Sequence, residues 1–212
     1  MDVLVAGGHG KIGLRLLVLL AREGHCARGL IRNPNQAAEL EAAGAQAVIG
    51  DLERDDVSAQ AAGADAIVFA AGAGPGSGAE RKRTVDLGGA VRLIEAAHTS
   101  DVRRYVIVSS FGAADPASGA EAMRPYLEAK AEADAALEAS GLDFTIVRPG
   151  RLTDGPGGGL VAAAPSLGRG GEIPRDDVAA TLLEVLLADN TIGKSFELLE
   201  GDVPIAEAVR AL

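Results

Sequence analysis

The sequence has few aromatic residues, a single cysteine and no apolar run long enough to span a bilayer. Of its 212 residues, 3% are aromatic and none is Trp, which disfavours an aromatic-lined nucleic-acid surface. The one cysteine, Cys26, cannot form an internal disulfide, so a reducing, cytoplasmic location is expected. We expect Cys26 to be a small buried apolar residue within a strand. The N-terminus enters an apolar segment without a basic region, which argues against a signal peptide.

Positive charge is also scarce relative to negative charge. The chain has 20 Lys and Arg residues against 30 Asp and Glu residues, a formal net charge of −10. This excess disfavours anionic surfaces, so we expect no nucleic-acid partner and no membrane partner. His25 and His98 are far apart and have no Cys or His neighbour at metal-ligand spacing. No metal site is therefore predicted.

Strand-like and helix-like segments alternate along the whole chain. Strands are predicted at Val3–Ala6, Ala27–Ile31, Ala47–Ile49, Ala66–Ala70, Tyr105–Val108, Phe144–Val147 and Phe196–Leu199. Helices are predicted at Lys11–Glu23, Gln36–Ala43, Asp55–Ala62, Glu80–His98, Pro125–Ser140, Asp176–Leu187 and Ile205–Ala211. This alternation is typical of right-handed βαβ units around a parallel sheet. We predict one α/β domain over residues 1–212, a three-layer, Rossmann-like, doubly wound parallel sheet whose substrate-side portion, from about 150–212, is small.

Three glycines follow the first predicted strand at three-residue intervals. Gly7, Gly10 and Gly13 form a turn between that strand and the first helix. Such a turn lets backbone N–H groups approach a pyrophosphate at the positive end of a helix, and a side chain at Gly7 or Gly10 would block the approach. The alternative is a tight turn with no ligand. The cofactor-binding residues predicted here are Gly7, Gly10, Lys11, Ile12 and Gly13.

Other candidate cofactor residues follow the next three strands. Arg32 ends the second strand, where an acidic residue would bind a ribose 2′-hydroxyl and an arginine suits a 2′-phosphate. NADP(H) is therefore preferred over NAD(H), which remains possible. After the third strand, Asp51 could accept from the adenine amino group beside Leu52, or only cap a turn. Ala71 and Gly72 follow the fourth strand, at an edge where ligands bind in open α/β sheets.

Two glycine-rich segments, Gly72–Ala79 and Thr153–Gly159, follow the fourth and sixth predicted strands. Both are predicted to be loops at the carboxyl edge of the sheet, where they could serve cofactor access or form a mobile lid. The alternative for the second loop is plain connection.

The clearest chemical pair is Tyr126 and Lys130, four residues apart on one face of a predicted helix. Pro125 suits the first turn of that helix. A lysine ammonium near a tyrosine hydroxyl stabilises the phenolate, so such a tyrosine can exchange a proton with a substrate oxygen. The pair follows a strand that ends in Ser109-Ser110. The alternative is a surface pair without function.

Together these motifs resemble the short-chain dehydrogenase/reductase superfamily, and more narrowly its atypical, NAD(P)-binding, epimerase/dehydratase-like group, close to the NmrA-like and biliverdin-reductase-B-like branches. The resemblance covers essentially the whole chain. It rests on the glycine spacing, Val108-Ser109-Ser110, Tyr126-x-x-x-Lys130, Arg148-Pro149-Gly150 and Asp176-Asp177-Val178-Ala179.

The resemblance implies a role for each matching position. Ser110 would hydrogen-bond the substrate carbonyl, Tyr126 would be the acid and base, and Lys130 would bind the nicotinamide ribose and support Tyr126. Asp86 stands where standard members have Asn, and an ionised carboxylate cannot donate as an amide does. We expect Asp86 to orient Lys130 or a water, with an exposed helix carboxylate as the alternative. Pro149 would shape the nicotinamide wall through its backbone.

These residues predict an NADP(H)-binding oxidoreductase, or an epimerase/dehydratase-like relative, that acts on a small carbonyl or hydroxyl substrate. The substrate is a small molecule that the sequence does not identify, and the chain is expected to be a monomer or homodimer. Two alternatives stay open. One is a non-catalytic, NADP(H)-sensing regulatory protein, which the aspartate at position 86 favours. The other is a flavin- or biliverdin-reductase-like activity, in which solvent supplies the proton.

Overall fold

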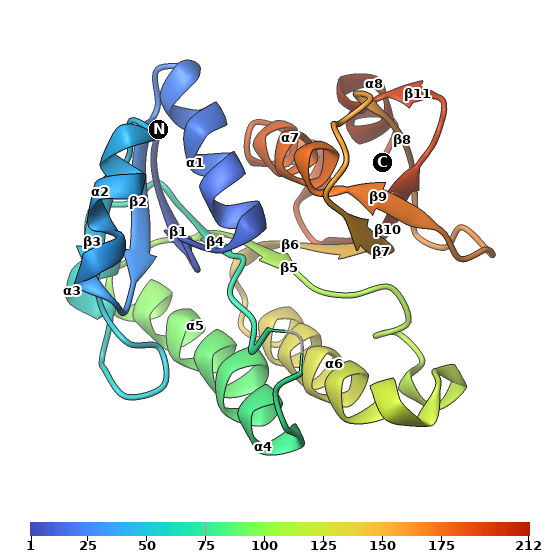
Figure 1. The fold of residues 1–212 in the computed structure, drawn as a ribbon, viewed down its shortest axis with the longest axis horizontal. Helices are drawn as coiled ribbons and strands as arrows, with labels where there is room; N and C mark the ends of the chain where they lie inside the picture. The colour runs from blue at the N-terminus through green and yellow to red at the C-terminus, as the bar shows by residue number, and fades with distance from the viewer. Residues whose placement is uncertain (75) are drawn as a thin grey trace.

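The computed structural model describes residues 1–74 and 76–212 (Figure 1). Pro75, within the predicted Gly72–Ala79 loop, lies outside the described residues. A nine-stranded sheet forms the middle layer, and Figure 1 shows helices α1 and α7 on one face and α4, α5 and α6 on the other. The strand order is β11-β8-β10-β6-β5-β4-β1-β2-β3, with a separate pair of β7 and β9. The predicted three-layer α/β class is therefore confirmed.

The strands that pair in parallel match the predicted ones within about two residues at each end. They are β1 (Asp2–Ala6), β2 (Cys26–Ile31), β3 (Gln46–Ile49), β4 (Ala66–Phe69), β5 (Arg104–Val108), β6 (Asp143–Pro149) and β10 (Lys194–Glu200). The order reverses direction at β1, because β2 lies on one side of it and β4 on the other. Ligands of open α/β sheets bind at this kind of switch point.

The helices flank this sheet in chain order. They are α1 (Lys11–Arg22), α2 (Ala37–Ala42), α3 (Ser58–Ala61), α4 (Ala79–Arg81), α5 (Ala90–Thr99), α6 (Arg124–Glu138), α7 (Arg175–Leu186) and α8 (Ile205–Arg210). Between α4 and α5 the chain winds as a π-helix over Lys82–Gly89, so the predicted Glu80–His98 helix is continuous but changes its winding. Such π segments are frequent at functional sites.

Four short strands were not predicted, because each is brief and follows glycine or proline. They are β7 (Arg151–Thr153), β8 (Leu160–Ala164), β9 (Glu172–Pro174) and β11 (Val203–Pro204). β8 pairs antiparallel with β10 and β11, so the sheet is mostly rather than wholly parallel. The predicted Thr153–Gly159 loop is therefore wrong at its first residue, which ends β7.

The predicted Asp55–Ala62 helix is also too long. Only Ser58–Ala61 is helical. The Asp55 carboxylate accepts the Asp51 N–H at 2.8 Å, and the Asp56 carboxylate accepts the Ser58 N–H at 2.9 Å. These side-chain hydrogen bonds hold turns that compete with helix formation.

Two apolar clusters, one on each face of the sheet, hold the layers together. Leu16, Leu17 and Leu20 of α1 pack with the α7 residues Val178 and Leu182 on one face. On the other face, side chains of α5 and α6 pack against the opposite side of β4 and β5. The strands are apolar on both faces because both are covered, which fixes the carboxyl ends of β1 to β6 side by side.

Cys26 does not belong to this core. The expectation of a buried cysteine is wrong, because Cys26 is exposed at the first residue of β2, beside the N-terminal residues. Among the described residues, no helix is long and apolar enough to cross a membrane.

Candidate dinucleotide site

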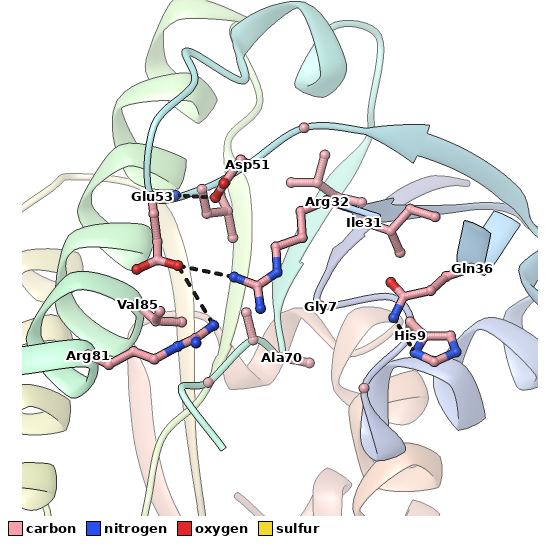
Figure 2. Close-up of a pocket in the computed structure, with 16 residues that line it drawn as sticks. Gly7, His9, Ile31, Arg32, Gln36, Asp51, Glu53, Ala70, Arg81 and Val85 are labelled. Carbon is pink, nitrogen blue, oxygen red and sulfur yellow. Dashed lines mark hydrogen bonds and ion pairs between the residues drawn. The ribbon is translucent and has the colours of Figure 1, made fainter. Parts of the chain in front are cut away.

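A pocket of about 340 Å³ opens at the carboxyl ends of β1 to β4, at the switch point (Figure 2). Each wall comes from the residues that follow one strand. The lining residues are Gly7, His9, Gly10, Leu30, Ile31, Arg32, Gln36, Gly50, Asp51, Leu52, Glu53, Ala70, Ala71, Gly72, Arg81 and Val85. Seven predicted cofactor residues are among them: Gly7, Gly10, Arg32, Asp51, Leu52, Ala71 and Gly72.

The glycine turn leaves no room for side chains at two of its positions. Gly7 has φ +82°, and a Cβ added there would lie 2.8 Å from Ala71 Cα. A Cβ on Gly13 would lie 2.3 Å from the Gly7 carbonyl oxygen. The Gly10 N–H donates to that same oxygen at 2.8 Å, which closes the turn. Glycine is therefore required by backbone packing here, as well as by ligand approach.

The start of α1 is open to an anion. Gly10 caps the helix without a side-chain hydrogen bond, and no acidic residue lies in the first turn. The first N–H groups of a helix have no partner within it and carry the positive end of its dipole. These features fit the pyrophosphate of a dinucleotide. Ile12 is 8% exposed and packs in the core, so only its backbone faces this end.

Lys11 projects away from the pocket rim toward the second glycine-rich segment. Its Nζ donates to Asp154 Oδ2 at 2.6 Å, and Arg175 donates to the other carboxylate oxygen at 2.7 Å. The hydrogen bond from Lys11 lowers the pKa of the Asp154 carboxyl. Nearby, the Asp177 carboxylate accepts the N–H groups of Gly158 and Gly159 at 3.0 and 2.8 Å. The segment after β7 is therefore tied to the starts of α1 and α7.

Arg32 lies on the pocket wall rather than on an open surface (Figure 2). Its side chain is 55% exposed and donates to Glu53 at 3.2 Å. Asp51, on the same wall, accepts the Glu53 N–H at 2.9 Å, which is the turn-capping geometry. Leu52 is 9% exposed and presents an apolar side chain to the pocket.

The predicted chemical pair lies beside the ends of β4 and β5. Lys130 is 3% exposed, and its Nζ donates to the Val108 carbonyl at 3.0 Å. The same Nζ lies 6.0 Å from the centroid of the half-buried Tyr126 ring and 5.6 Å from that of Phe69. Ser110, two residues after Val108, is half-buried. α6 thus presents Tyr126 and Lys130 to the carboxyl edge that also carries the glycine turn.

Asp86 is buried rather than at the surface. It is 1% exposed, and its Oδ1 lies 3.3 Å from Lys130 Nζ. Its Oδ2 accepts the Ala73 N–H at 3.2 Å. The π-helical stretch that carries Asp86 thus joins the loop after β4 to the lysine of α6. An exposed carboxylate, the alternative at this position, is excluded by this burial.

A second buried carboxylate lies one helical turn beyond Lys130. Asp134 accepts the Ser109 hydroxyl at 2.9 Å and Arg148 Nε at 3.0 Å. Burial raises the pKa of Asp134, and the hydrogen bond from Ser109 and the charge of Arg148 oppose that shift. Pro149, next in β6, is buried and accepts the Phe111 N–H at 2.9 Å through its carbonyl. This network fixes the ends of β5 and β6 against α6.

Several pocket residues were missed by sequence reasoning. They are His9, Gln36, Glu53, Arg81 and Val85. Glu53 directly follows Asp51-Leu52, and Arg81 and Val85 are four apart on the helix after the first glycine-rich segment, so their spacing was a usable signal. Within the described residues, no three His, Cys, Asp or Glu side chains are grouped to hold a metal ion.

The switch-point pocket and its glycine turn define the class of protein, which is a dinucleotide-binding protein with a Rossmann-like fold. The chain belongs to a family described as NAD(P)H-binding, whose model matches residues 7–189. A Bacillus subtilis protein named as an uncharacterized sugar epimerase, YhfK, is 46% identical over 215 residues, with 100% of both chains covered.

Two solved structures are similar over the whole chain. One, provisionally described as an NAD-dependent epimerase/dehydratase from Bacillus halodurans, has 43% identity, a TM-score of 0.97 and 100% of both chains covered. The other is the oxidoreductase ylbE from Lactococcus lactis, with 30% identity, a TM-score of 0.89, and 100% of this chain and 96% of that chain covered. The chain therefore stands among the oxidoreductases and epimerase-like enzymes of the NAD(P)-binding family.

Proposed function

We propose that the protein is an NADP(H)-dependent oxidoreductase that reduces a small carbonyl substrate, with Tyr126 as the proton donor. The observation that carries this proposal is the placement of Tyr126 beside a buried lysine that is fixed to the end of β5. Lys130 donates to the Val108 carbonyl and lies 6.0 Å from the Tyr126 ring centroid. A tyrosine on an unrelated surface has no buried cation behind it.

The preference for NADP(H) over NAD(H) is supported by the charge of the pocket wall. Arg32 follows β2, where NAD-binding proteins of this fold carry an acidic residue. Arg81 lines the same pocket from the far side. A guanidinium matches phosphate geometry and stays charged at all relevant pH values. Two of them beside the adenosine end favour a cofactor with a 2′-phosphate.

When bound, NADPH supplies a hydride from nicotinamide C4 to the substrate carbon. The Tyr126 hydroxyl donates its proton to the substrate oxygen, and the Lys130 ammonium stabilises the phenolate that remains. Ser110 donates a hydrogen bond to the same oxygen and orients it. An ammonium has three donors. One serves Val108 and a second faces Asp86, so the third is free to hold a ribose hydroxyl.

An epimerase-like reaction is a second candidate, because the 46% identical relative is named as a sugar epimerase. In that reaction Tyr126 takes the proton of a sugar hydroxyl as the carbon is oxidised, and returns it when the opposite face is reduced. The same residues act, but the cofactor is not consumed overall. Conversion of a sugar with only a trace of NADP⁺ would distinguish this reaction from net reduction.

Substitution of each tyrosine in turn tests the role of Tyr126. Tyr126→Phe should bind NADPH as the wild type does and oxidise it about 10²- to 10⁴-fold more slowly across a carbonyl panel. Tyr105→Phe is the matched control, because that hydroxyl is buried and bonds to the Ala90 carbonyl at 3.5 Å. It should retain full activity.

Two outcomes would contradict the proposal. Equal turnover by Tyr126→Phe and the wild type would remove the tyrosine from the mechanism, and reduction of FMN or biliverdin by both would indicate solvent as the proton source. A wild-type protein that binds NADPH but oxidises it with no member of the panel would instead indicate a cofactor sensor.

A further inference from the structure

Two arginines from distant elements converge on one carboxylate at the rim of the pocket (Figure 2). Arg32 follows β2, Arg81 ends α4, and Glu53 lies in the turn after β3. Glu53 Oε2 lies 3.2 Å from Arg32 Nη1 and 3.9 Å from Arg81 Nη2. The other carboxylate oxygen, Oε1, accepts the Thr84 hydroxyl at 2.7 Å. All but Thr84 line the pocket.

The geometry of this cluster is that of a weakly held anion. Each arginine contacts the same oxygen, and neither makes the paired, bidentate contact that is the strong form of this interaction. The side chains of Arg32, Arg81 and Glu53 are 55%, 45% and 25% exposed, so solvent reaches every member. A phosphate has three terminal oxygens and nearly two charges, and it can satisfy both guanidiniums at once.

We propose that Glu53 determines how strongly the protein discriminates between NADPH and NADH. Its carboxylate occupies the anion subsite of Arg32 and Arg81, a 2′-phosphate displaces it, and a 2′-hydroxyl leaves it in place. This inference rests on the proposed use of NADP(H). Glu53 therefore opposes NADPH binding, in contrast to the two arginines that favour it.

The backbone around Glu53 allows this displacement. The Glu53 N–H is held by Asp51 and so keeps its place. Only the carboxylate has to turn, and it leaves behind a single hydroxyl, that of Thr84, which is exposed and can bond to water. No buried group loses its partner in the exchange, because each of the residues involved is at least partly exposed.

Calorimetric titration of Glu53→Gln with NADPH and with NADH tests the proposal. The variant should bind NADPH about tenfold more tightly, because one negative charge next to the phosphate is removed. Its affinity for NADH should change by less than about twofold. Glu132→Gln is the charge-matched control, because Glu132 pairs with Arg83 on the surface outside the pocket. This control should bind both cofactors as the wild type does.

Two further variants test the same subsite from its other sides. Thr84→Val frees the carboxylate, so NADPH binding should tighten in the same direction as in Glu53→Gln but by less. Arg81→Ala should weaken NADPH binding at least fivefold and leave NADH binding unchanged. A loss of NADPH affinity in Glu53→Gln, or equal tightening for both cofactors, would overturn the inference.

The outcome for the wild type separates this inference from the proposed function. If the wild type binds neither cofactor, or binds NADH more tightly than NADPH, the proposed cofactor is wrong and the inference falls with it. If the wild type prefers NADPH and Glu53→Gln leaves that preference unchanged, the proposed function stands and only the role of Glu53 is refuted.

Discussion

Removal of the charge of Asp86 should strongly destabilise the protein. Asp86 and Lys130 are 1% and 3% exposed, and their charged atoms are 3.3 Å apart. Asp86→Asn keeps an oxygen for the Ala73 N–H but leaves the ammonium without its neighbouring carboxylate. Loss of one partner of a buried pair costs about 3–5 kcal/mol. Lys130 keeps its bond to Val108, so we expect the lower end, about 3 kcal/mol.

The loss is measurable by urea unfolding and by thermal melting. For a chain of this length, 3 kcal/mol corresponds to a fall in Tm of about 6–12 °C. Lys130→Met should also be destabilising, because it leaves the Asp86 carboxylate buried without its cation. The double variant should be more stable than the sum of the two losses predicts, since it removes both buried charges. Glu132→Gln, which breaks an exposed pair, should leave the midpoint unchanged.

Two results would refute this reasoning. A loss of less than about 1 kcal/mol for Asp86→Asn would mean that the pair is solvated or readily replaced. Strict additivity in the double variant would mean that Asp86 and Lys130 are not coupled, whatever each contributes alone.

Two further predictions concern packing and pH. Gly13→Ala should lower stability by about 1–3 kcal/mol in urea unfolding, because its Cβ would lie 2.3 Å from the Gly7 oxygen, whereas Gly158→Ala, in open space, should not. The raised pKa of Asp134 means that the folded protein binds the proton more tightly, so wild-type stability relative to Asp134→Asn should fall as pH rises above about 4. A difference that grows with pH over this range would indicate that the charge of Arg148 outweighs burial.

Local signals in the sequence were sufficient for the fold and for one wall of the site. The glycines after β1 require a particular backbone, and the strands buried on both faces are continuous apolar runs, so neither depends on distant residues. The same holds for Tyr126 and Lys130, which share a helix face through their spacing alone. The predicted elements at these places match the structure closely.

Contacts between distant segments could not be predicted in the same way. Arg81 contacts Glu53 only because the helical segment after β4 folds back over the turn after β3. Lys11 and Asp154 are 143 residues apart. The burial of Asp86 was equally hidden, because the polar residues Lys82, Arg83 and Thr84 precede it and nothing local distinguishes the inward face of a π-helix from the outward one.

The predicted cofactor-binding cations all pair with carboxylates, but at very different burial. The pairs are Lys11–Asp154, Arg32–Glu53 and Lys130–Asp86. Exposed pairs are weak and are screened by salt, so Lys11 and Arg32 can exchange a carboxylate for a phosphate oxygen. Lys130 cannot leave Asp86 without uncovering a buried charge. The phosphate end of the site is therefore built to exchange ion pairs on binding, whereas the end that carries Tyr126 keeps its ion pair and holds its lysine in one place.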